Sequence, residues 1–563
     1  MCSSSARLAD LPPRARRTRP VFHRPVLSLF LCLVCSAIAA PAQDAPAEHA
    51  VHGSVLNSVT REPIARALVT AFNASIAVFT DDQGKFSFTV PASRQIVNGD
   101  LVVRKPGFLE DESSRIIVSL SPENSQDLNL ALTPESLIIG RVHLPKAGSF
   151  ERMNLQLYRR DVSEGRAQWH MFLQTRTHAN GEFRFFGLRA GTYKLFTLEL
   201  ADRDPQDLNL DGPHFGYPPS YYPAATDFSA AAPITLAPGQ TFEAELTPPL
   251  HEYFQVRISL PNATPDLRAV EIAVFPRDHP GPGYSLGFDS RQQTITGELP
   301  NGTYTVEAIA DDKRMTGITT FTVHDSPALT PVLLLASIPE IPISIKAEFT
   351  NKPRPDISGA VRFSSPSARP PSTMSMATRF NLISADEASR RSSEGLYVGD
   401  ISQNTHLSAV PGRYYLQSDP QRGYVASASS AGVDLLLNPL VVTPGSNAPI
   451  DVTLRDDTAE IHGTIEDTDP DKSNFSSLPS VYCVPLPDSP GKYQPGQTTR
   501  TQADVSFSCP LLAPGSYRVL AFEHPQPEFE YRNPEAMRPF ESKGPVVRVN
   551  GGQKESVRIP LNP

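Results

Sequence analysis

The sequence predicts an all-β protein in which about five small antiparallel β-sandwiches follow a signal peptide. A Gly-x-Tyr phrase, preceded each time by an apolar residue, returns at nearly constant spacing. Its copies are Gly191–Tyr193, Gly302–Tyr304, Gly412–Tyr414 and Gly515–Tyr517. Subtracting the glycine numbers gives steps of 111, 110 and 103 residues. A repeat of this length is a small domain and not a solenoid unit.

The local pattern agrees with this fold class. Apolar and polar residues alternate with period two between turn residues, which is typical of strands in sandwiches. Proline contributes 56 residues, twice the usual share of about 5%. Proline suits sheet edges and turns but breaks helix interiors. The array architecture argues against a single large enzyme.

The repeats divide the chain into a leader and five modules. A tight turn before each repeated Tyr, with the ring facing the core, predicts a structural role for these tyrosines. The first module lacks this phrase and has Pro91 in its place. The expected ranges are 1–42 for the signal peptide, then 50–133, 134–248, 249–340, 341–455 and 456–563 for modules 1 to 5.

The N-terminus has the three parts of a secretory signal. Arginines precede an apolar run from Val26 to Ala40, and Ala40-Pro41-Ala42 offers a small-x-small cleavage site. The run of about 15 residues is too short to span a bilayer comfortably. We expect cleavage near Ala42, no membrane span afterwards, and a location in the periplasm, on the outer cell surface or in the medium.

Only Cys483 and Cys509 remain after removal of the leader. An even count in an exported chain predicts a disulfide, and both residues lie in strand-like segments of module 5. Two buried free thiols are the alternative. The net charge of −9 makes a nucleic-acid partner improbable, because such proteins usually carry a basic face.

Several segments of module 1 resemble the carboxypeptidase regulatory-like domain. They are Gly53-Ser-Val, Pro63-Ile-Ala-Arg-Ala67-Leu-Val, Thr80-Asp-Asp-Gln-Gly84-Lys-Phe-Ser-Phe88 and Lys105-Pro-Gly107-Phe. Modules 2 and 5 look similar, and modules 3 and 4 share mainly the Gly-x-Tyr turn. The resemblance implies a transthyretin-like (prealbumin-like) sandwich, grouped with carbohydrate-binding-like folds. In that family the module is an accessory, so the resemblance implies a structural, adhesive or sugar-binding role, and fold alone does not decide between them.

The strongest binding candidate is an aromatic loop rich in proline. Its residues are Phe215, Tyr217, Tyr221, Tyr222, Asp227 and Phe228. Exposed rings of this kind could stack on the C–H faces of a pyranose while the carboxylate binds hydroxyls. The alternative is that the rings pack over an open sheet end or a module junction.

A second candidate is a calcium loop. Asp207, Asn209 and Asp211, followed by Gly212, match the first half of an oxygen-ligand loop. The twelfth position is Pro218 and not the bidentate Glu, so a solvated acidic loop is the alternative. Calcium bound there would be structural, and we expect no other cofactor.

Two shorter motifs resemble catalytic signatures but lack their context. Gly283-Tyr-Ser285-Leu-Gly287 matches a nucleophile elbow, yet Pro280 and Pro282 precede it and a strand-like stretch follows, so we expect a loop. His251-Glu252 lacks the second histidine of a zinc helix.

The sequence therefore predicts a non-enzymatic, monomeric scaffold or binding protein of the bacterial envelope, with polysaccharide or an envelope protein as partner. An adhesive or structural spacer without a small-molecule ligand is the alternative. A third reading is an accessory subunit of a secreted peptidase or glycosidase.

Overall fold

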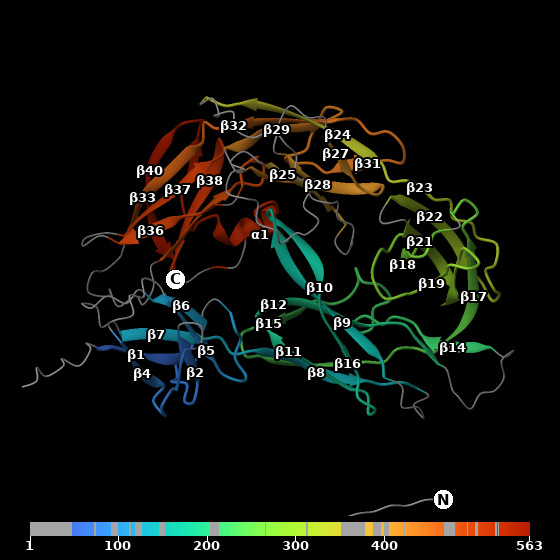
Figure 1. Cartoon of the computed structure of the whole chain (residues 1–563), viewed down its shortest axis with the longest axis horizontal. Coiled ribbons are helices and arrows are strands. Elements are labelled where there is room, and N and C mark those ends of the chain that lie inside the picture. Colours follow the sequence, from blue (N-terminus) through green and yellow to red (C-terminus); the bar gives the residue numbers. More distant parts are fainter. Residues whose placement is uncertain are drawn as a thin grey trace, which may run out of the picture.

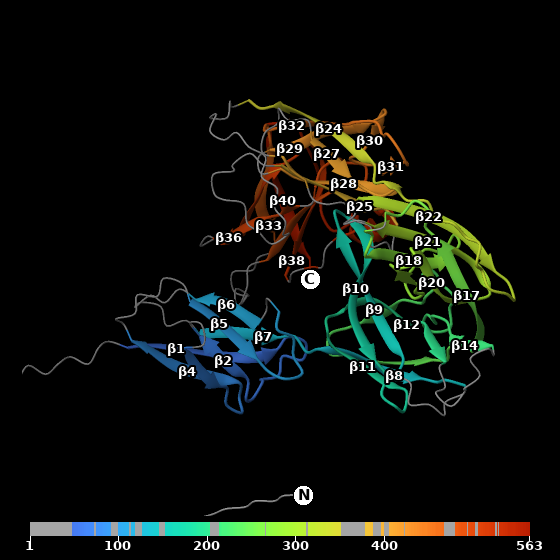
Figure 2. The same cartoon turned by 45° about the vertical axis from the view of Figure 1, so that its right-hand side comes forward.

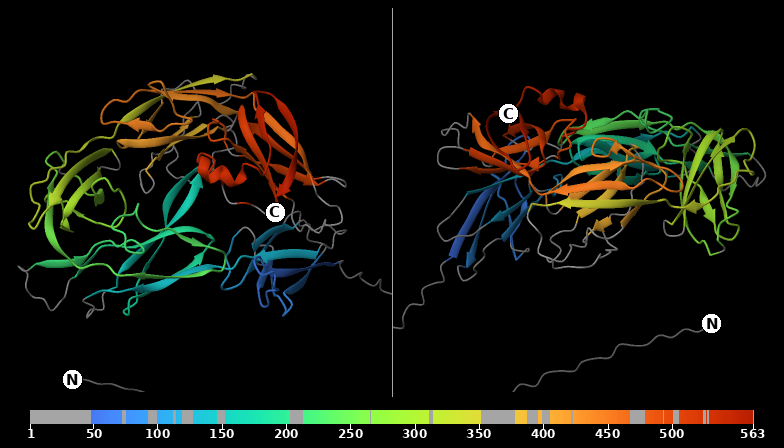
Figure 3. Two further views of the ribbon diagram at one scale, coloured as in Figure 1. Left: turned by 180° about the vertical axis from the view of Figure 1, so that it is seen from behind. Right: turned by 90° about the horizontal axis from the view of Figure 1, so that it is seen from above.

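The chain is an all-β array of small sandwiches in a computed structural model, with one short α-helix and one 3₁₀ turn named among the described residues (Figure 1). The structure describes residues 48–562 except 72–74, 92–98, 112–113, 119–126, 146–151, 203–212, 265, 311–313, 351–377, 387–395, 399–404, 421–422, 467–478, 493, 501–504, 524–525 and 527–528. The expected leader, 1–42, lies outside these residues. The five sandwiches follow a curved path that brings module 5 back towards module 2 (Figures 2 and 3).

Module 1 packs a three-stranded sheet, β4-β1-β7, against a four-stranded sheet, β3-β2-β5-β6. Its core contains Val55, Val103 and Leu132, which are fully buried. The strands are β1 (Glu48–Asn57), β2 (Leu68–Ala71), β3 (Ile76–Phe79), β4 (Lys85–Pro91), β5 (Gly99–Arg104), β6 (Arg115–Val118) and β7 (Asp127–Leu132).

Module 2 packs β11-β8-β16 against β10-β9-β12-β15. Its additional strands β13 and β14 leave this sandwich and join the next module. The strands are β8 (Ser136–Val142), β9 (Asn154–Ser163), β10 (Arg166–Arg176), β11 (Glu182–Leu188), β12 (Gly191–Thr197), β13 (Leu200–Asp202), β14 (His214–Tyr217), β15 (Ile234–Leu236) and β16 (Thr241–Leu246).

Module 3 packs β18-β21-β22-β23 against a five-stranded sheet, β13-β14-β17-β20-β19. The second sheet thus contains strands from two modules, and it crosses the border expected at residue 249. The strands are β17 (His251–Ser259), β18 (Val270–Pro276), β19 (Gly287–Asp289), β20 (Thr294–Pro300), β21 (Gly302–Ala310), β22 (Met315–Val323) and β23 (Ala336–Ser337).

Module 4 packs β27-β24-β32-β29-β30 against β26-β25-β28-β31. Its core includes Ile341, Phe380 and Leu382, all fully buried. The strands are β24 (Glu340–Glu348), β25 (Thr378–Ser384), β26 (Leu396–Val398), β27 (Thr405–Ser408), β28 (Gly412–Pro420), β29 (Tyr424–Ser430), β30 (Val433–Asp434), β31 (Leu440–Val442) and β32 (Ile450–Arg455).

Module 5 packs β40-β33-β37-β36 against β35-β34-β38-β39, and the two sheets join where the end of β40 also pairs with β38. The outer face of β34 and β38 is covered by an aromatic cluster that includes Phe529 and Tyr531. The elements are β33 (Ala459–Glu466), β34 (Ser480–Pro485), β35 (Gln494–Pro495), β36 (Gln497–Arg500), β37 (Val505–Leu512), β38 (Gly515–Phe522), α1 (Pro534–Met537), the 3₁₀ turn η3 (Arg538–Phe540), β39 (Val546–Val549) and β40 (Lys554–Asn562).

Modules 1, 2, 4 and 5 repeat one strand arrangement. The first strand of each pairs antiparallel with a later strand and parallel with the last strand, as β1 does with β4 and β7. Gly53, Gly140 and Gly463 occupy the same place in the first strands of modules 1, 2 and 5. A methyl group on any of them would overlap the carbonyl oxygen of the last strand, so glycine permits this close parallel pairing.

The four repeated tyrosines form one structural device. Each is buried at the start of a strand, and each hydroxyl donates a hydrogen bond to the carbonyl oxygen four residues earlier, at 2.7 to 2.9 Å. This is the geometry of a tyrosine corner, which ties the turn to the strand it begins. The residues are Tyr193, Tyr304, Tyr414 and Tyr517.

Candidate functional site

The aromatic loop lies on the outer face of module 2 and not in solvent. Along β9 the core residues Leu155 and Leu157 alternate with Tyr158, which faces the other way. Tyr221 and Phe228 of the loop cover that outer face. Successive side chains of a strand point to opposite faces of the sheet. The apolar side chains on the outer face of β9 therefore need a cover separate from the module core.

The structure separates the predicted ligand residues into buried and half-buried groups. Tyr217, Tyr221 and Phe228 are only 1–2% exposed, so their ring faces are closed to a sugar in this conformation. Tyr221 packs against Phe196 and Phe228 at centroid distances of 5.1 and 6.4 Å. This is the arrangement that the packing alternative predicts.

Phe215, Tyr222 and Asp227 are half-buried. Tyr222 packs edge-on against Phe242 at 5.8 Å. Burial alone would raise the pKa of Asp227. Hydrogen bonds from Ser229 and from backbone N–H groups lower it by more, so the pKa lies below its usual range. Its carboxylate is hydrogen-bonded within its own loop, and Oδ2 also lies 3.7 Å from His279 Nδ1 of module 3.

The loop ends against the segment that matches the nucleophile-elbow motif. The Tyr221 hydroxyl donates to the Pro282 carbonyl oxygen of module 3. Gly281 and Gly283 allow the approach, since a methyl group at either position would lie within 2.7 Å of Phe228 or Pro219. The motif itself is a loop followed by the short strand β19, without a helix, as expected. We call this contact region, formed by residues 199–202 and 213–228 with 251–264 and 266–304, the 2–3 junction.

A shared sheet makes the 2–3 junction continuous. β14 pairs antiparallel with β17 through His214–Tyr253, Phe215–Glu252 and Gly216–His251. The His251-Glu252 pair is therefore part of a strand ladder. The side chains of His214 and Glu298 add a contact across the same sheet, with Nδ1 and Oε1 2.6 Å apart.

A carboxyl group lies buried at this junction. Both the backbone N–H and the hydroxyl of Ser285 donate to Glu199 Oε2, at 3.1 and 3.2 Å. Glu199 Oε1 and the Tyr253 hydroxyl are buried and lie close enough for Tyr253 to favour the charged form of Glu199. Burial raises the pKa of Glu199 to about 7, an effect that the bonds from Ser285 only partly offset.

Tyrosines surround this carboxyl group. Burial and the negative charge of Glu199 together raise the pKa of Tyr284 to about 12, and they raise the pKa of Tyr253 and Tyr304 further. Tyr284 packs edge-on against Tyr304 at 5.4 Å. The arrangement favours the protonated form of Glu199, and sequence reasoning missed this group because Glu199 stands alone in a strand-like stretch.

The predicted calcium residues Asp207, Asn209 and Asp211 lie outside the described residues. In the part of the chain that is described, no group of three potential metal ligands occurs. Across those same residues, no helix combines the length and the apolar character needed to cross a bilayer.

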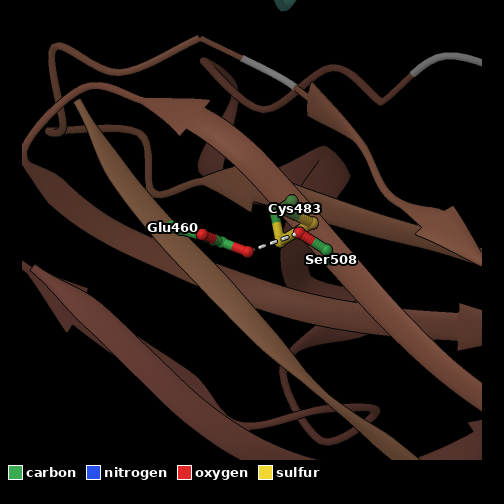
Figure 4. The surroundings of a disulfide bond; sticks show 4 residues. Glu460, Cys483 and Ser508 are labelled. Atoms are coloured by element: carbon green, nitrogen blue, oxygen red, sulfur yellow. Dashed lines mark hydrogen bonds between the residues drawn. A yellow bond between two sulfur atoms is a disulfide. The ribbon is translucent and has the colours of Figure 1, made fainter.

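The predicted disulfide is confirmed. Cys483 of β34 and Cys509 of β37 are bonded with their Cα atoms 6.4 Å apart, and both are fully buried (Figure 4). Ser508 beside it donates to Glu460 at 2.9 Å. The bond crosslinks two strands within module 5.

No family model matches the chain, and no curated protein sequence matches it. Among solved structures, the TIE protein of Bacillus anthracis is 11% identical over 52% of this chain and 50% of its own, with a TM-score of 0.16. The minor pilin of Streptococcus agalactiae is 13% identical over 36% and 95%, with a TM-score of 0.18. The pilus adhesin SpaC of Lactobacillus rhamnosus GG is 13% identical over 52% and 42%, with a TM-score of 0.16. At these TM-scores the likeness carries no argument about this chain.

Proposed function

We propose that the chain is an exported, non-enzymatic scaffold protein of the bacterial envelope in which modules 2 and 3 are held at a fixed relative position. The observation that carries this proposal is the place of the aromatic loop. Tyr221 is buried on module 2 and donates to Pro282 of module 3, and Phe228 packs beside it on module 2. A loop used in this way fixes geometry between modules.

Export rests on the leader sequence and on the disulfide. Buried disulfides persist in oxidising compartments and are rare where thiols are kept reduced. The Cys483–Cys509 bond therefore supports a location outside the cytoplasm. The resemblance to the carboxypeptidase regulatory-like domain is part of the same proposal, and the repeated strand arrangement of modules 1, 2, 4 and 5 supports it.

Carbohydrate binding is the competing function. If it occurs at the loop, it must use the half-buried rings Phe215 and Tyr222, since the others are closed. A structural calcium at Asp207, Asn209 and Asp211 would be compatible with either function and would show as a calcium-dependent rise in melting temperature.

The test is a binding screen on the mature chain. We expect no retardation on affinity gels across a panel of polysaccharides and no binding on a glycan array. Retardation that disappears in the Phe215→Ala/Tyr222→Ala double variant, but persists in the exposed-ring control Phe186→Ala, would replace the scaffold with a sugar-binding protein. Phe186 is 64% exposed on β11 of the same module, away from the loop.

A further inference from the structure

The hairpin of β9 and β10 reaches out of module 2 to two distant modules. In Figure 1 it rises from the module 2 sandwich to α1 of module 5. Its strands run from Asn154 to Arg176 and pair from Asn154–Arg176 to Ser163–Arg166, so the turn at the tip is Glu164-Gly165. We call this element the latch hairpin.

The tip is shaped for contact. Glu164 and Gly165 both have positive φ, 50° and 74°. Such two-residue turns favour Asn, Asp or Gly, so a glutamate in the first position is conformationally disfavoured. Its carboxylate Oε1 lies 3.2 Å from Lys492 Nζ of module 5 and 3.5 Å from Gln417 Nε2 of module 4. The side chain that makes the turn less favourable also makes these contacts.

Gly165 forms the other half of the tip contact. A methyl group on Gly165 would lie 2.7 Å from three atoms of the Tyr531 ring. The backbone N–H of Arg532 donates to the Gly165 carbonyl oxygen at 3.0 Å. Tyr531 belongs to the aromatic cluster that covers the outer face of module 5. The bare backbone at Gly165 therefore lets module 5 pack against the tip.

Charged and polar side chains extend the contact below the tip. Arg160 Nη2 lies 2.6 Å from Glu530 Oε2 of module 5. The Arg166 guanidinium sits 3.8 Å above the Tyr415 ring of module 4 and donates to the Leu437 carbonyl oxygen at 3.2 Å. Gln168 donates to the Ser384 carbonyl oxygen at 3.1 Å. These contacts join residues more than 200 positions apart in the sequence.

The contacts between consecutive modules, together with the latch hairpin, join modules 2 to 5 in a ring. Module 2 shares a sheet with module 3. Module 3 continues directly into module 4, because only two residues separate β23 from β24 and the Ile338 N–H between them donates to the Arg314 carbonyl oxygen of module 3 at 2.8 Å. Module 4 meets module 5 where Thr350 of the β24 end donates to Asp456, which precedes β33, at 2.7 and 2.9 Å. The latch hairpin then returns from module 5 to module 2.

A second two-residue turn has the same backbone geometry as the hairpin tip, but its glycine packs against no other module. Ala431-Gly432, between β29 and β30, has φ values of 50° and 81°, close to those of the latch tip. A methyl group on Gly432 would meet nothing within 4 Å. Turn geometry alone therefore does not require a partner, and the contacts at Glu164-Gly165 are a separate feature of that tip.

We propose that the latch hairpin closes modules 2 to 5 into a ring and that it releases without unfolding any module. The contact is made of ion pairs, hydrogen bonds, the Arg166 guanidinium over the Tyr415 ring and the Tyr531 ring packed on Gly165, whereas each module keeps its own apolar core. The Glu164 and Lys492 side chains are 31% and 42% exposed, so salt screens their attraction. The protein then has a closed and an open form, and ionic strength shifts the balance between them.

The test compares matched double variants of the full mature chain by small-angle X-ray scattering. Glu164→Lys/Gly165→Ala reverses the tip charge and adds one methyl group facing Tyr531. Ala431→Lys/Gly432→Ala introduces the same two residue types at the turn between β29 and β30. We expect the first variant to have a larger radius of gyration than wild type at about 0.1 M salt, and the second to match wild type. Raising the salt to about 1 M, where the Debye length falls from about 10 Å to about 3 Å, should move wild type towards the open value.

A charge swap keeps the test independent of folding defects. Adding Lys492→Glu to Glu164→Lys restores the ion pair with opposite polarity but removes the Lys492 hydrogen bond to the Ser418 carbonyl oxygen, so closure should return in part relative to Glu164→Lys alone. Identical scattering of wild type and both matched double variants would overturn the proposal, because the contact would then hold nothing. Loss of cooperative unfolding of module 2 or module 5 in the latch variant would overturn it as well, since the hairpin would then be part of module folding.

Discussion

Modules 1 and 2 meet through a short linker, whereas modules 2 and 3 are built into each other. The linker, Thr133–Ser136, is held by backbone hydrogen bonds from Leu109 to Thr133 and from Glu135 to Gly107. The 2–3 junction instead has a shared sheet, buried aromatic rings and a buried carboxyl group. The same sandwich therefore appears once as an appended module and once as half of a larger unit.

The difference shows that the repeated residues determine the module and that the non-repeated loops determine how modules join. The tyrosine corners recur in modules 2 to 5 with the same hydrogen bond. Tyr221 and Glu199 have no counterpart in the repeat pattern, and they lie at the 2–3 junction, where strands of two modules share a sheet. Variants at these positions should separate the two kinds of connection.

Removing the ring of Tyr221 should have the largest effect on this comparison. Tyr221→Ala leaves a cavity between Phe196 and Phe228 and deletes the hydrogen bond to Pro282. We expect a loss of about 3–5 kcal/mol in the unfolding free energy of modules 2 and 3, as for other large-to-small aromatic changes. Calorimetry of the full chain would show this shift with the module 1 transition unchanged. The exposed-ring variant Phe186→Ala should stay within about 0.5 kcal/mol of wild type, and equal shifts for both variants would contradict the junction role of Tyr221.

The buried carboxyl group predicts a pH dependence confined to modules 2 and 3. The pKa of Glu199 is about 7 when folded against 4.5 when exposed, so the folded state binds the proton more tightly. Its stabilising contribution is complete below about pH 4.5 and is lost as the pH rises to about 7, amounting to about 3 kcal/mol at most.

The Glu199→Gln variant mimics the protonated form and should remove this dependence. Thermal melts from pH 4.5 to pH 8 would measure it. Glu252→Gln is the matched control, because Glu252 lies on β17 of the same junction but is exposed. A wild-type profile that matches the Glu199→Gln profile would show that the carboxyl group does not titrate in this range.

The shared strand arrangement predicts equal behaviour of modules 1 and 2 at their first strands. Gly53→Ala and Gly140→Ala each force a methyl group into the carbonyl oxygen of the last strand. We expect each to cost its own module about 1–3 kcal/mol through overpacking. Gly287→Ala meets only an ordinary contact at 3.7 Å and serves as control. A loss in one module but not the other would show that the two sandwiches are built differently.

The sequence predicted the sandwich fold of the modules but not the contacts between modules. Gly-x-Tyr spacing and period-two alternation predicted the fold class, the burial of the four tyrosines and the Cys483–Cys509 disulfide, because these depend on local pattern and on parity of cysteines. Three features depend on residues that the fold brings together from distant segments. They are the contact of Tyr221 with module 3, the burial of Glu199 and the contacts of Glu164 with modules 4 and 5. A two-residue turn containing Glu-Gly between long alternating strands was the one local sign of the latch hairpin.

The most direct test of the account compares the unfolding of three fragments. They are residues 48–134 (module 1), 134–248 (module 2 alone) and 134–340 (modules 2 and 3). We predict cooperative thermal unfolding of the first and third fragments and a marked loss of stability in the second, where β14 lacks β17 and Tyr221 lacks Pro282. A module 2 fragment that melts at the same temperature as in the two-module fragment would contradict the claim that modules 2 and 3 form one unit.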